Sequence, residues 1–472
     1  MKLKAKKPAK EKERKMIDFL EVCARAESGP LMNEKDFDFK LFLPELQRIQ
    51  KEFDIVYPSG AFINCDDELA DRIFLAAKEF LVSVGTYCMD SNRVIKVDHG
   101  EIDRILAGPS GRCVFGEGKD QHVFTTRKPD DATLPDCHVN YGTIHSSEQL
   151  AVDTMSANVS FPEARAISIS TVTSIRGQEI RSGSPLEVYA GIKAINLARQ
   201  ACARAGRPGM AIINHVPATA NPVATIASSA PQFGGRPSDG WLIGILAEHK
   251  IDYGSMSKIA YLQNWGANIG SQGAPSLGGY CGDAAGTAIV NTAYFLMGMV
   301  LFGANYHLCF PIHFQKSCCS TRDVLWCVSA SAAAAARNLN FPVSWRAYLA
   351  SGCNTKSFFH EACAWLLAAV TSGAAAVKMP TPAAAVKLDA STPMEARFGI
   401  AMTKAASKLS RSQAHDIMAN LLEKYEPLLN NPPLGDTGPE CYNFSTGKPS
   451  AEYQRLYDDT ICELQEMGIP LT

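Results

Sequence analysis

Apolar residues recur at three- and four-residue spacing along several stretches of the chain, which is typical of packed α-helices. Within Pro185–Ala205 they follow this helical period, and Gly206-Arg207-Pro208-Gly209 then supplies residues suited to positive φ and chain reversal. Met210–Val216 follows as a short apolar run of the kind that forms buried strands. The pattern predicts a helix, a tight stop and a strand.

Two helix starts carry the sequence of a capping box. Ser184-Pro185-Leu186-Glu187 places a serine at the cap, proline in the first turn and a glutamate that can reach back to the free amides. Thr392-Pro393-Met394-Glu395 repeats the same arrangement. We therefore expect helices to begin at Pro185 and at Pro393.

Beyond residue 143 the hydrophobic pattern predicts an alternation of strands and helices. Strands are expected near Ala166–Val172, Met210–Val216, Ser257–Gln263, Tyr306–Phe314, Val343–Leu349 and Ala374–Met379. Helices are expected near Pro185–Ala205, Trp241–Lys250, Ala284–Phe302, Thr321–Asn338, Thr355–Thr371 and Pro393–Leu409. Repeated parallel crossovers of this spacing favour an α/β fold, a (β/α)8 TIM barrel, over an open doubly wound sheet.

The same pattern divides the chain into four parts. Residues 1–15 form a basic tail, residues 16–143 a mostly helical N-terminal segment, residues 144–410 the barrel and residues 411–472 a C-terminal helical segment that packs on it. The tail carries seven lysines and one arginine against two glutamates, a composition typical of a solvated and disordered extension.

Composition excludes several classes of function. The 472 residues are 46% hydrophobic, enough for a large core, and the net charge of −2 gives no electrostatic support for a nucleic-acid partner. The basic start is not followed by an apolar segment and a small-residue cleavage site, so we expect a cytoplasmic protein. Fifteen scattered cysteines without a CxxC pair favour reduced thiols over disulfides or a zinc site.

One apolar stretch raises the question of a membrane span. Residues 284–315 contain no Asp, Glu, Lys or Arg. Asn291 and Thr292 interrupt the apolar run, Gly303 ends it, and no strongly basic flank follows. We therefore expect no membrane partner, and predict a helix whose apolar surface is buried against another subunit.

Short motifs along the whole chain carry a family resemblance. The run Ala205-Gly206-Arg207-Pro208-Gly209-Met210, with Cys202 and Ala203 before it, resembles the segment that precedes the pyrrolysine of archaeal monomethylamine methyltransferases. Further matches occur collinearly at Cys88-Met89-Asp90, Arg93-Val94-Ile95-Lys96, Val172–Gly177, Leu277–Tyr280, Met394–Arg397 and Glu440–Tyr442. The resemblance covers the chain from about residue 15 to Leu471.

Membership of this family implies a fold and a reaction. It implies a (β/α)8 barrel with a helical N-terminal segment, assembled as a homo-oligomer such as a hexamer. In the family a methyl group passes from an amine to the Co(I) of a corrinoid (cobalamin) carried on a separate small protein. A cognate corrinoid protein and a small methylated substrate are therefore the expected partners, with no permanently bound cofactor.

The departures from the family pattern concern its catalytic residues. Counting on without gaps, the pyrrolysine position falls at Ile213, and two adjacent family glutamates fall at Ala285-Gly286. A family glutamine and tyrosine are not clearly retained around Trp345-Arg346-Ala347-Tyr348. Because several residues have changed together, we expect a changed substrate instead of simple decay.

The chemistry of methyl transfer limits which methylated compounds can be the substrate. The electrophilic imine of pyrrolysine is thought to capture the free amine, and Ile213 has no electrophile. A quaternary ammonium or sulfonium needs no such help, since its leaving group departs neutral, and aromatic faces can hold the cation. The rings offered for such a cage are Trp241, Tyr261, Trp265, Tyr280, Tyr306 and Trp345.

Two alternatives stay open. A methoxy compound would need a general acid for the departing oxygen, for which His215, His313, Asp283 and Lys316 are candidates. A catalytically silent binding or scaffold subunit is also compatible with the lost residues.

The candidate residues form two groups. We expect catalytic roles for His215, Gln263, His313, Gln315 and Arg346, and substrate contacts from Ile213, Tyr261, Tyr280, Asp283, Ala285 and Trp345. No metal site is expected, because His307 and His313 on one extended strand would lie roughly 20 Å apart.

Overall fold

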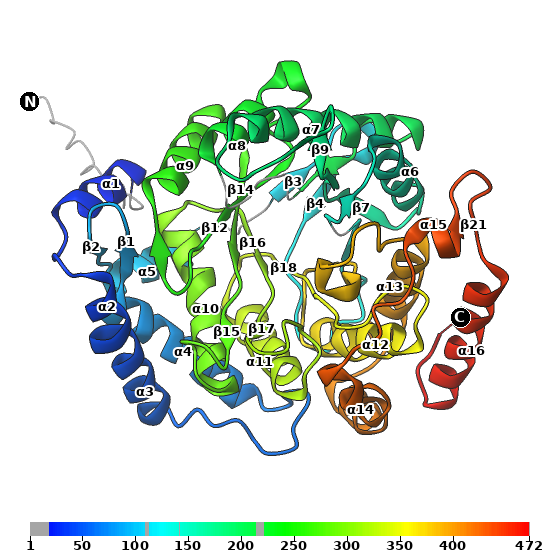
Figure 1. Ribbon diagram of the computed structural model, residues 1–472. Helices are drawn as coiled ribbons and strands as arrows, with labels where there is room; N and C mark the ends of the chain where they lie inside the picture. Colours follow the sequence, from blue (N-terminus) through cyan, green and yellow to red (C-terminus); the bar gives the residue numbers. More distant parts are fainter. Residues whose placement is uncertain (1–17, 109–112, 141, 214–220, 472) are drawn as a thin grey trace, which may run out of the picture.

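Eight parallel strands form the centre of the molecule (Figure 1). The computed structural model describes residues 18–108, 113–140, 142–213 and 221–471. In sheet order the strands are β11 (Ala211–Ile212), β7 (Ala164–Ile167), β5 (Asp136–Val139), β19 (Ala376–Lys378), β18 (Val343–Trp345), β16 (Tyr306–Cys309), β14 (Asn268–Gly273) and β12 (Gly240–Gly244). Every neighbouring pair in this order is parallel.

Ile213 closes this sheet into a barrel. Its amide donates to the Ile167 carbonyl at 2.8 Å on one side, and on the other side it forms a parallel bridge with Gly240. A Cβ atom at Gly240 would collide with Tyr306 Oη and would lie 2.6 Å from Ile213 Cγ2, so only glycine allows this approach. The predicted (β/α)8 barrel is confirmed.

Helices lie between successive barrel strands and cover the outside of the barrel. They are α6 (Glu148–Val159), α7 (Pro185–Arg204), α8 (Pro222–Ser229), α9 (Tyr253–Trp265), α10 (Ala284–Leu301), α11 (Arg322–Asn338), α12 (Lys356–Thr371) and α13 (Pro393–Ala406). The predicted helices starting near residues 185, 284, 321, 355 and 393 are confirmed to within three residues at either end.

Two predicted elements are wrong. The strand expected at Ser257–Gln263 is part of α9, which Asp252 caps by accepting the Ser255 amide hydrogen at 2.6 Å. The helix expected at Trp241–Lys250 is instead the strand β12, followed by an irregular segment. All five residues of β12 are buried, and a short apolar run of this kind fits a buried strand and a buried helix equally well.

The two predicted capping boxes have different outcomes. At α13 the Thr392 hydroxyl accepts from the Met394 amide at 3.0 Å, and the Glu395 carboxylate accepts from the Thr392 amide at 2.7 Å. At α7 the box is wrong: the Ser184 hydroxyl donates to the Arg181 carbonyl at 2.7 Å, and Glu187 accepts from the Gly183 amide. Glu187 thus reaches one residue further back than a capping box requires.

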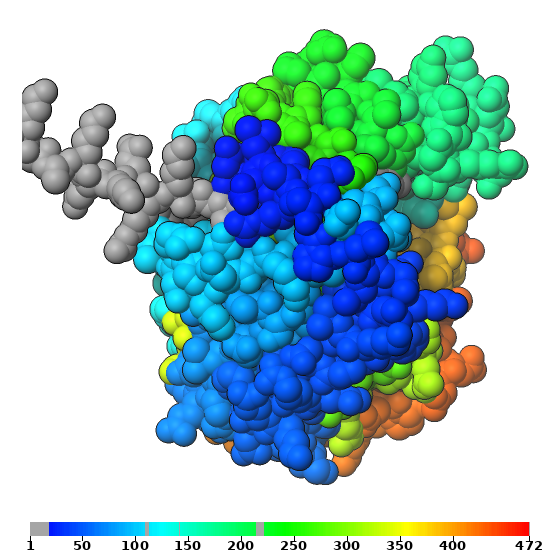
Figure 2. Space-filling model, turned by 90° about the vertical axis from the view of Figure 1, so that its left-hand side faces the viewer, coloured from blue at the N-terminus to red at the C-terminus, as the bar shows by residue number. Residues whose placement is uncertain are grey.

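The N-terminal segment covers one side of the barrel and dominates the face seen in Figure 2. It contains α1 (Phe19–Ser28), α2 (Glu34–Asp36), the π-helix η1 (Phe37–Phe42), α3 (Leu43–Glu52), α4 (Asp67–Val84) and α5 (His99–Leu106). Its strands β1 (Thr86–Cys88) and β2 (Arg93–Ile95) form a small sheet with β13 (Lys250–Ile251). The barrel itself begins with β5 at Asp136, before the expected boundary at residue 144.

Shorter elements connect these parts. The hairpin strands are β3 (Cys113–Phe115) and β4 (His122–Phe124), with η2 (Gly118–Asp120) between them. Three two-stranded pairs are β6 (Ile144–His145) with β8 (Thr171–Val172), β9 (Ser174–Ile175) with β10 (Gln178–Glu179), and β15 (Ser276–Leu277) with β17 (Ile312–His313). Two 3-10 turns are η3 (Pro231–Phe233) and η4 (Pro382–Ala385). The C-terminal segment has α14 (Arg411–Tyr425), η5 (Glu426–Asn430), α15 (Gly438–Cys441), β20 (Tyr442–Asn443), β21 (Lys448–Pro449) and α16 (Ala451–Glu466).

Helix α10 is an internal helix of this chain. Among the described residues it is the helix long and apolar enough to cross a membrane, and 94% of it is buried inside the molecule. It packs between α4 of the N-terminal segment and α11 of the barrel. The expectation that another subunit covers its apolar surface is therefore wrong, because this chain covers that surface itself.

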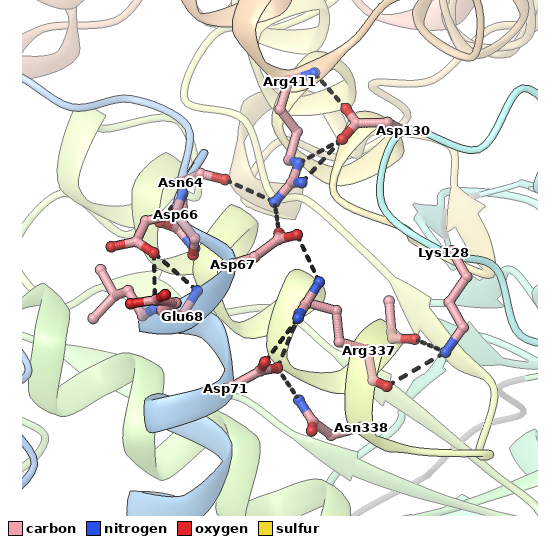
Figure 3. A network of polar contacts seen from close by, with 12 residues as sticks. Asn64, Asp66, Asp67, Glu68, Asp71, Lys128, Asp130, Arg337, Asn338 and Arg411 are labelled. Carbon is pink, nitrogen blue, oxygen red and sulfur yellow. Dashed lines mark hydrogen bonds and ion pairs between the residues drawn. The ribbon is translucent and has the colours of Figure 1, made fainter.

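A charge network joins the two terminal segments to the barrel (Figure 3). Arg411 of α14 contacts Asp67 of α4 at 2.8 Å and Asp130, in the segment leading to β5, at 2.9 Å. Arg337 at the end of α11 contacts Asp67 at 2.6 Å and Asp71 at 2.7 Å. Since α11 ends and β5 begins nearby, the network lies at the amino-terminal side of the barrel, which in this fold serves stability.

Replacing Arg411 tests this network. The Arg411 side chain is 9% exposed, whereas its two partners are about half-exposed, so water screens the contacts in part. We expect Arg411→Gln to lower the free energy of unfolding by roughly 1–3 kcal/mol, measured by urea denaturation. Arg48→Gln, which removes exposed ion pairs on α3, is the matched control and should change it by less than about 0.5 kcal/mol. Equal effects of the two variants would contradict the network's role.

His307 lies buried behind the barrel wall and predicts a pH dependence of stability. Its Nδ1 contacts Ser271 Oγ at 2.7 Å and its ring packs 4.9 Å from Phe295 of α10. Burial lowers the pKa of His307 from its ordinary value of 6.5 to about 3. Between these pH values the unfolded chain binds one more proton at this position, so acid destabilises the fold.

We expect His307→Asn to reduce this acid sensitivity. The free energy of unfolding of the unmodified chain should fall from pH 6.5 toward pH 3, and this histidine contributes about 1.4 kcal/mol per pH unit to the slope. The variant should show a shallower slope in urea denaturation at pH 7, 6, 5 and 4. His99→Asn, at an exposed position, is the control. Parallel curves for His307→Asn and the unmodified chain would contradict the assignment.

Candidate functional site

The amino half of the barrel interior is closed by hydrocarbon and aromatic side chains. Strand alternation turns Ile213, Leu242 and Tyr306 inward, where they form one buried cluster with Phe115 and Phe124 of the β3–β4 hairpin. The Phe115 ring lies 5.2 Å from the Tyr306 ring. This packing closes the amino end of the barrel, and we call these five side chains the floor.

The carboxyl half of the interior is polar. His138 of β5 and Lys378 of β19 are direct partners in the strand register, and Ser344 of β18 places its Oγ 3.2 Å from His138 Nδ1. Gln272 of β14 and Arg346, two residues after Ser344, point the same way by strand alternation. We call these five residues the polar layer. In this fold the reactive end of the barrel is the carboxyl end of the strands.

Several inward-facing polar atoms have no hydrogen-bond partner among the described residues. They are Lys378 Nζ, His138 Nε2, Gln272 Oε1, Tyr306 Oη and Ser168 Oγ, all with their surface buried. Buried polar atoms in folded proteins are almost always hydrogen-bonded, and exceptions mark water, ligand or catalytic sites. The grouping of five such atoms in one barrel interior therefore identifies it as the candidate site.

Burial sets the charge of these groups. It lowers the pKa of Lys378 well below its ordinary value, and the positive charge of Arg346 lowers it further. Burial also lowers the pKa of His138 to about 3, so the imidazole is neutral at physiological pH. The Arg346 side chain is the permanent cation of the layer, and its guanidinium lies 4.1 Å from the ring centre of Tyr348.

No described inward position in the carboxyl half of the barrel holds a carboxylate. Asp136 lies at the amino end of β5, where it contacts His122 at 3.0 Å. Near the carboxyl side, Glu361 of α12 accepts the backbone amides of Ala350 and Ser351 at 2.8 and 2.9 Å. Asp389 accepts the Ser146 amide at 2.8 Å. These carboxylates are engaged in fixing loops, which leaves the polar layer positively charged.

The structure brings two of the described candidate residues into the barrel interior. Ile213 is 3% exposed within the floor, and Arg346 belongs to the polar layer. Trp345 is adjacent to Arg346 on β18 and therefore faces the opposite way, with its ring 6.1 Å from Phe295 of α10. The structure thus places the Trp345 ring between the barrel wall and α10. His215 lies outside the described residues.

Two candidates on α9 lie outside the barrel. The Gln263 amide donates to the Phe302 carbonyl at 3.2 Å, which attaches α9 to the end of α10. Tyr261 packs 5.9 Å from Trp265, one helical turn away on the same helix. Both were expected on a strand, and the actual helix turns them into the outer layer.

His313 and Gln315 shape a turn beside the barrel. His313 lies on β17, which pairs with β15 and not with the barrel sheet. Its Nδ1 accepts from the backbone amides of Gln315 and Lys316 at 3.2 and 3.3 Å. The Gln315 side chain is exposed. The structure does not bring these residues to the interior surface.

Three further candidates hold the N-terminal segment. Tyr280 is 40% exposed, with its ring 5.9 Å from Phe39. Asp283 caps α10 by accepting the Gly286 amide at 2.8 Å, and Ala285 is fully buried in the first turn of the same helix, which packs on α4. The structure thus places these three residues at the start of α10 and beside the N-terminal segment, and not on the inner wall of the barrel.

The predicted aromatic cage does not form from the expected rings. Of the six, Tyr306 alone faces the interior. Trp241 points outward from β12 and packs 5.6 Å from Trp265 of α9. Among the described residues no group of three or more His, Cys, Asp or Glu side chains is placed to hold a metal ion.

Sequence reasoning missed His138 and Lys378. The signal for Lys378 was available, because it is the one charged residue in the expected strand Ala374–Met379. A charge that folds into a buried strand must face either the barrel interior or a partner in the helix layer. His138 had no comparable signal, since the strand that carries it was not predicted.

Comparisons with known proteins agree with the fold. Residues 17–469 match the family model described as monomethylamine methyltransferase MtmB. MtmB of Methanosarcina mazei is 27% identical over 456 residues, which is 97% of this chain and 99% of that protein.

Two solved structures resemble the chain at nearly the same sequence identity. The crystal structure of Methanosarcina barkeri MtmB aligns with a TM-score of 0.92 and 26% identity, covering 97% of this chain and 99% of that one. The crystal structure of the hydroxylamine complex of MtmB gives the same values. With nearly the whole chain matched, the protein belongs to the monomethylamine methyltransferase (MtmB) family.

Proposed function

We propose that this protein is a pyrrolysine-independent corrinoid-protein methyltransferase whose methyl donor is already activated, with a quaternary ammonium group as the best candidate. The observation that carries the proposal is Ile213, which stands at the family's pyrrolysine position by direct count and projects a hydrocarbon side chain into the barrel. A hydrocarbon offers no electrophile for capturing an amine.

The leaving group explains why the donor must differ. Free methylamine would have to expel an amide anion, and methylammonium is small and strongly hydrated. In a quaternary ammonium, the C–N electron pair stays on nitrogen as the C–N bond breaks, so a neutral tertiary amine departs. The methyl carbon is transferred to Co(I), giving methyl-Co(III) with no proton to supply. The protein then needs only to orient the donor in line with cobalt.

The arrangement of the barrel supports a protein that orients the donor while cobalt attacks the methyl group. The floor of Ile213, Leu242 and Tyr306 closes the amino end, so a donor must enter and react at the carboxyl end. The corrinoid protein would dock over that end and present cobalt to the methyl group. We further propose a cytoplasmic homo-oligomer, although its contact surface is not α10, which lies inside this chain.

Methyl transfer to cob(I)alamin tests the proposal. The purified protein is mixed with cob(I)alamin and one donor at a time, chosen from quaternary ammonium, sulfonium, methoxy-arene and methylammonium compounds, and methylcobalamin is followed by its absorbance. We expect transfer from a quaternary ammonium or sulfonium donor and none above the protein-free rate from methylammonium.

Each other outcome contradicts the proposal in a defined way. Transfer from methylammonium would mean that an amine is demethylated without the imine. Transfer from methoxy-arenes alone would support an O-demethylase with a general acid. No transfer from any donor, with either cob(I)alamin or the corrinoid protein as acceptor, would support a silent binding subunit.

His215 is the remaining polar candidate beside Ile213 in the sequence. If it contacts the donor, we expect His215→Ala to lower the rate of methyl transfer by roughly 100-fold or more, the range for a positioned acid–base group. His99→Ala, at an exposed position on α5, is the control and should leave the rate unchanged. An unchanged rate in His215→Ala would remove this residue from the mechanism.

A further inference from the structure

Two buried cations elsewhere in this chain have carboxylate partners, whereas the buried guanidinium of Arg127 donates to the backbone carbonyls of Val370 and Ala374. Lys250 contacts Glu34 at 2.8 Å and Asp38 at 2.9 Å, and Arg207 contacts Asp120 at 2.7 Å. Such pairing is the rule, because transferring an uncompensated charge from water into a protein costs several kcal/mol or more. A buried cluster of basic side chains without carboxylates can take its negative charge from a bound ligand.

The polar layer is such a cluster. Lys378 ends β19 and Arg346 directly follows β18. The register pairs Trp345 with Val377, and its continuation by one residue places Arg346 level with Lys378. Lys378 Nζ is completely buried and has no hydrogen-bond partner among the described residues. Beside it, no hydrogen-bond partner for His138 Nε2 is found in the described part of the chain. These atoms can supply hydrogen bonds and positive charge to one bound group.

An acidic side chain of the chain itself does not fill this role. The described inward positions around Lys378 contribute Ser344, Gln272 and Ser168, which are neutral, and the carboxylates of Glu361 and Asp389 accept backbone amides elsewhere. Bound water would satisfy hydrogen bonds but would not neutralise the charge. A small anion satisfies both requirements.

We infer that the polar layer binds a carboxylate of the methyl donor, held by Lys378 and Arg346, so that the donor is a methylated zwitterion or acid and not a bare cation. The inference rests on the proposed methyl transfer and specifies its substrate class. With the carboxylate inside the barrel, the methylated end points to the carboxyl mouth, where methyl transfer to cobalt takes place.

The charge state of Lys378 agrees with this assignment. Without a counter-ion, burial and Arg346 lower the pKa of Lys378 well below its ordinary value. A carboxylate within hydrogen-bond distance favours the protonated amine and reverses this shift. A bound carboxylate and the protonated Lys378 amine would therefore stabilise each other.

Matched pairs of probes test the inference by binding alone. Calorimetric titration compares N,N,N-trimethylglycine with its carboxamide, which has the same quaternary ammonium but no negative charge. A second pair, 2-methoxybenzoate and 2-methoxybenzamide, places the carboxylate on an ether donor. We expect at least one acid to bind roughly 10- to 100-fold more tightly than its amide, the range for charge-assisted hydrogen bonds. The pair that shows this ratio identifies the donor scaffold.

Two lysine variants test whether the preference for the acid over the amide arises at Lys378. Lys378→Met keeps the length of the side chain and removes its amine, and it should bring the acid-to-amide ratio to within about threefold of unity. Lys258→Met removes another buried lysine, on α9 outside the barrel, and should keep the ratio of the unmodified protein. The comparison of acid and amide on the unmodified protein stands even if a variant does not fold.

The outcomes separate this inference from the proposed function. Tighter binding of an acid without methyl transfer to cob(I)alamin supports the anion site and contradicts the methyltransferase proposal. Methyl transfer from tetramethylammonium with equal affinity for acid and amide supports the methyltransferase and overturns the anion site. An acid preference that survives in Lys378→Met also overturns the assignment.

Discussion

A closed barrel of parallel strands imposes the constraint on which the site depends. Alternate side chains of eight strands must point into one interior that excludes bulk water. Each buried polar atom left without a hydrogen bond there costs about 1–3 kcal/mol. Considering the described residues alone, Lys378, His138 and Gln272 carry such atoms, so their presence opposes folding unless another group, a ligand or water compensates. Ligand binding, and not fold stability, therefore accounts for these polar residues in the barrel interior.

The rest of the molecule provides the stability that the interior lacks. Helix α10 is buried between α4 and α11, and the C-terminal segment is joined to α13 where Tyr453 donates to the buried Glu395. The charge network of Arg411 fixes both terminal segments at the amino-terminal side of the barrel. Ile213 closes the sheet in the same half, as part of the packed floor. The carboxyl end is left for substrate and for the corrinoid partner that the family implies.

The sequence predicted the architecture better than the site, for physical reasons. Long periodic helices such as α7, α10 and α12 were predicted closely, because their apolar spacing and boundary residues agree. Short elements were predicted less well. Ser257–Gln263 was predicted as a strand, but Asp252 caps the start of a helix there and the left-handed Gly266 ends it. For the site, Trp345 and Arg346 were both expected in the pocket, although adjacent strand residues face opposite sides. Which of them faces inward follows from strand pairing, which a single sequence does not provide.

In the inferred complex the barrel interior holds a carboxylate at Lys378, and the methyl group lies at the mouth. A crystal structure of the protein grown with N,N,N-trimethylglycine tests it most directly. The account predicts density for the ligand inside the barrel, with carboxylate oxygens about 2.7–3.2 Å from Lys378 Nζ and the trimethylammonium group toward the carboxyl end. A ligand bound with its trimethylammonium group against Lys378, or a barrel interior that excludes the ligand at saturating concentration, would contradict the account.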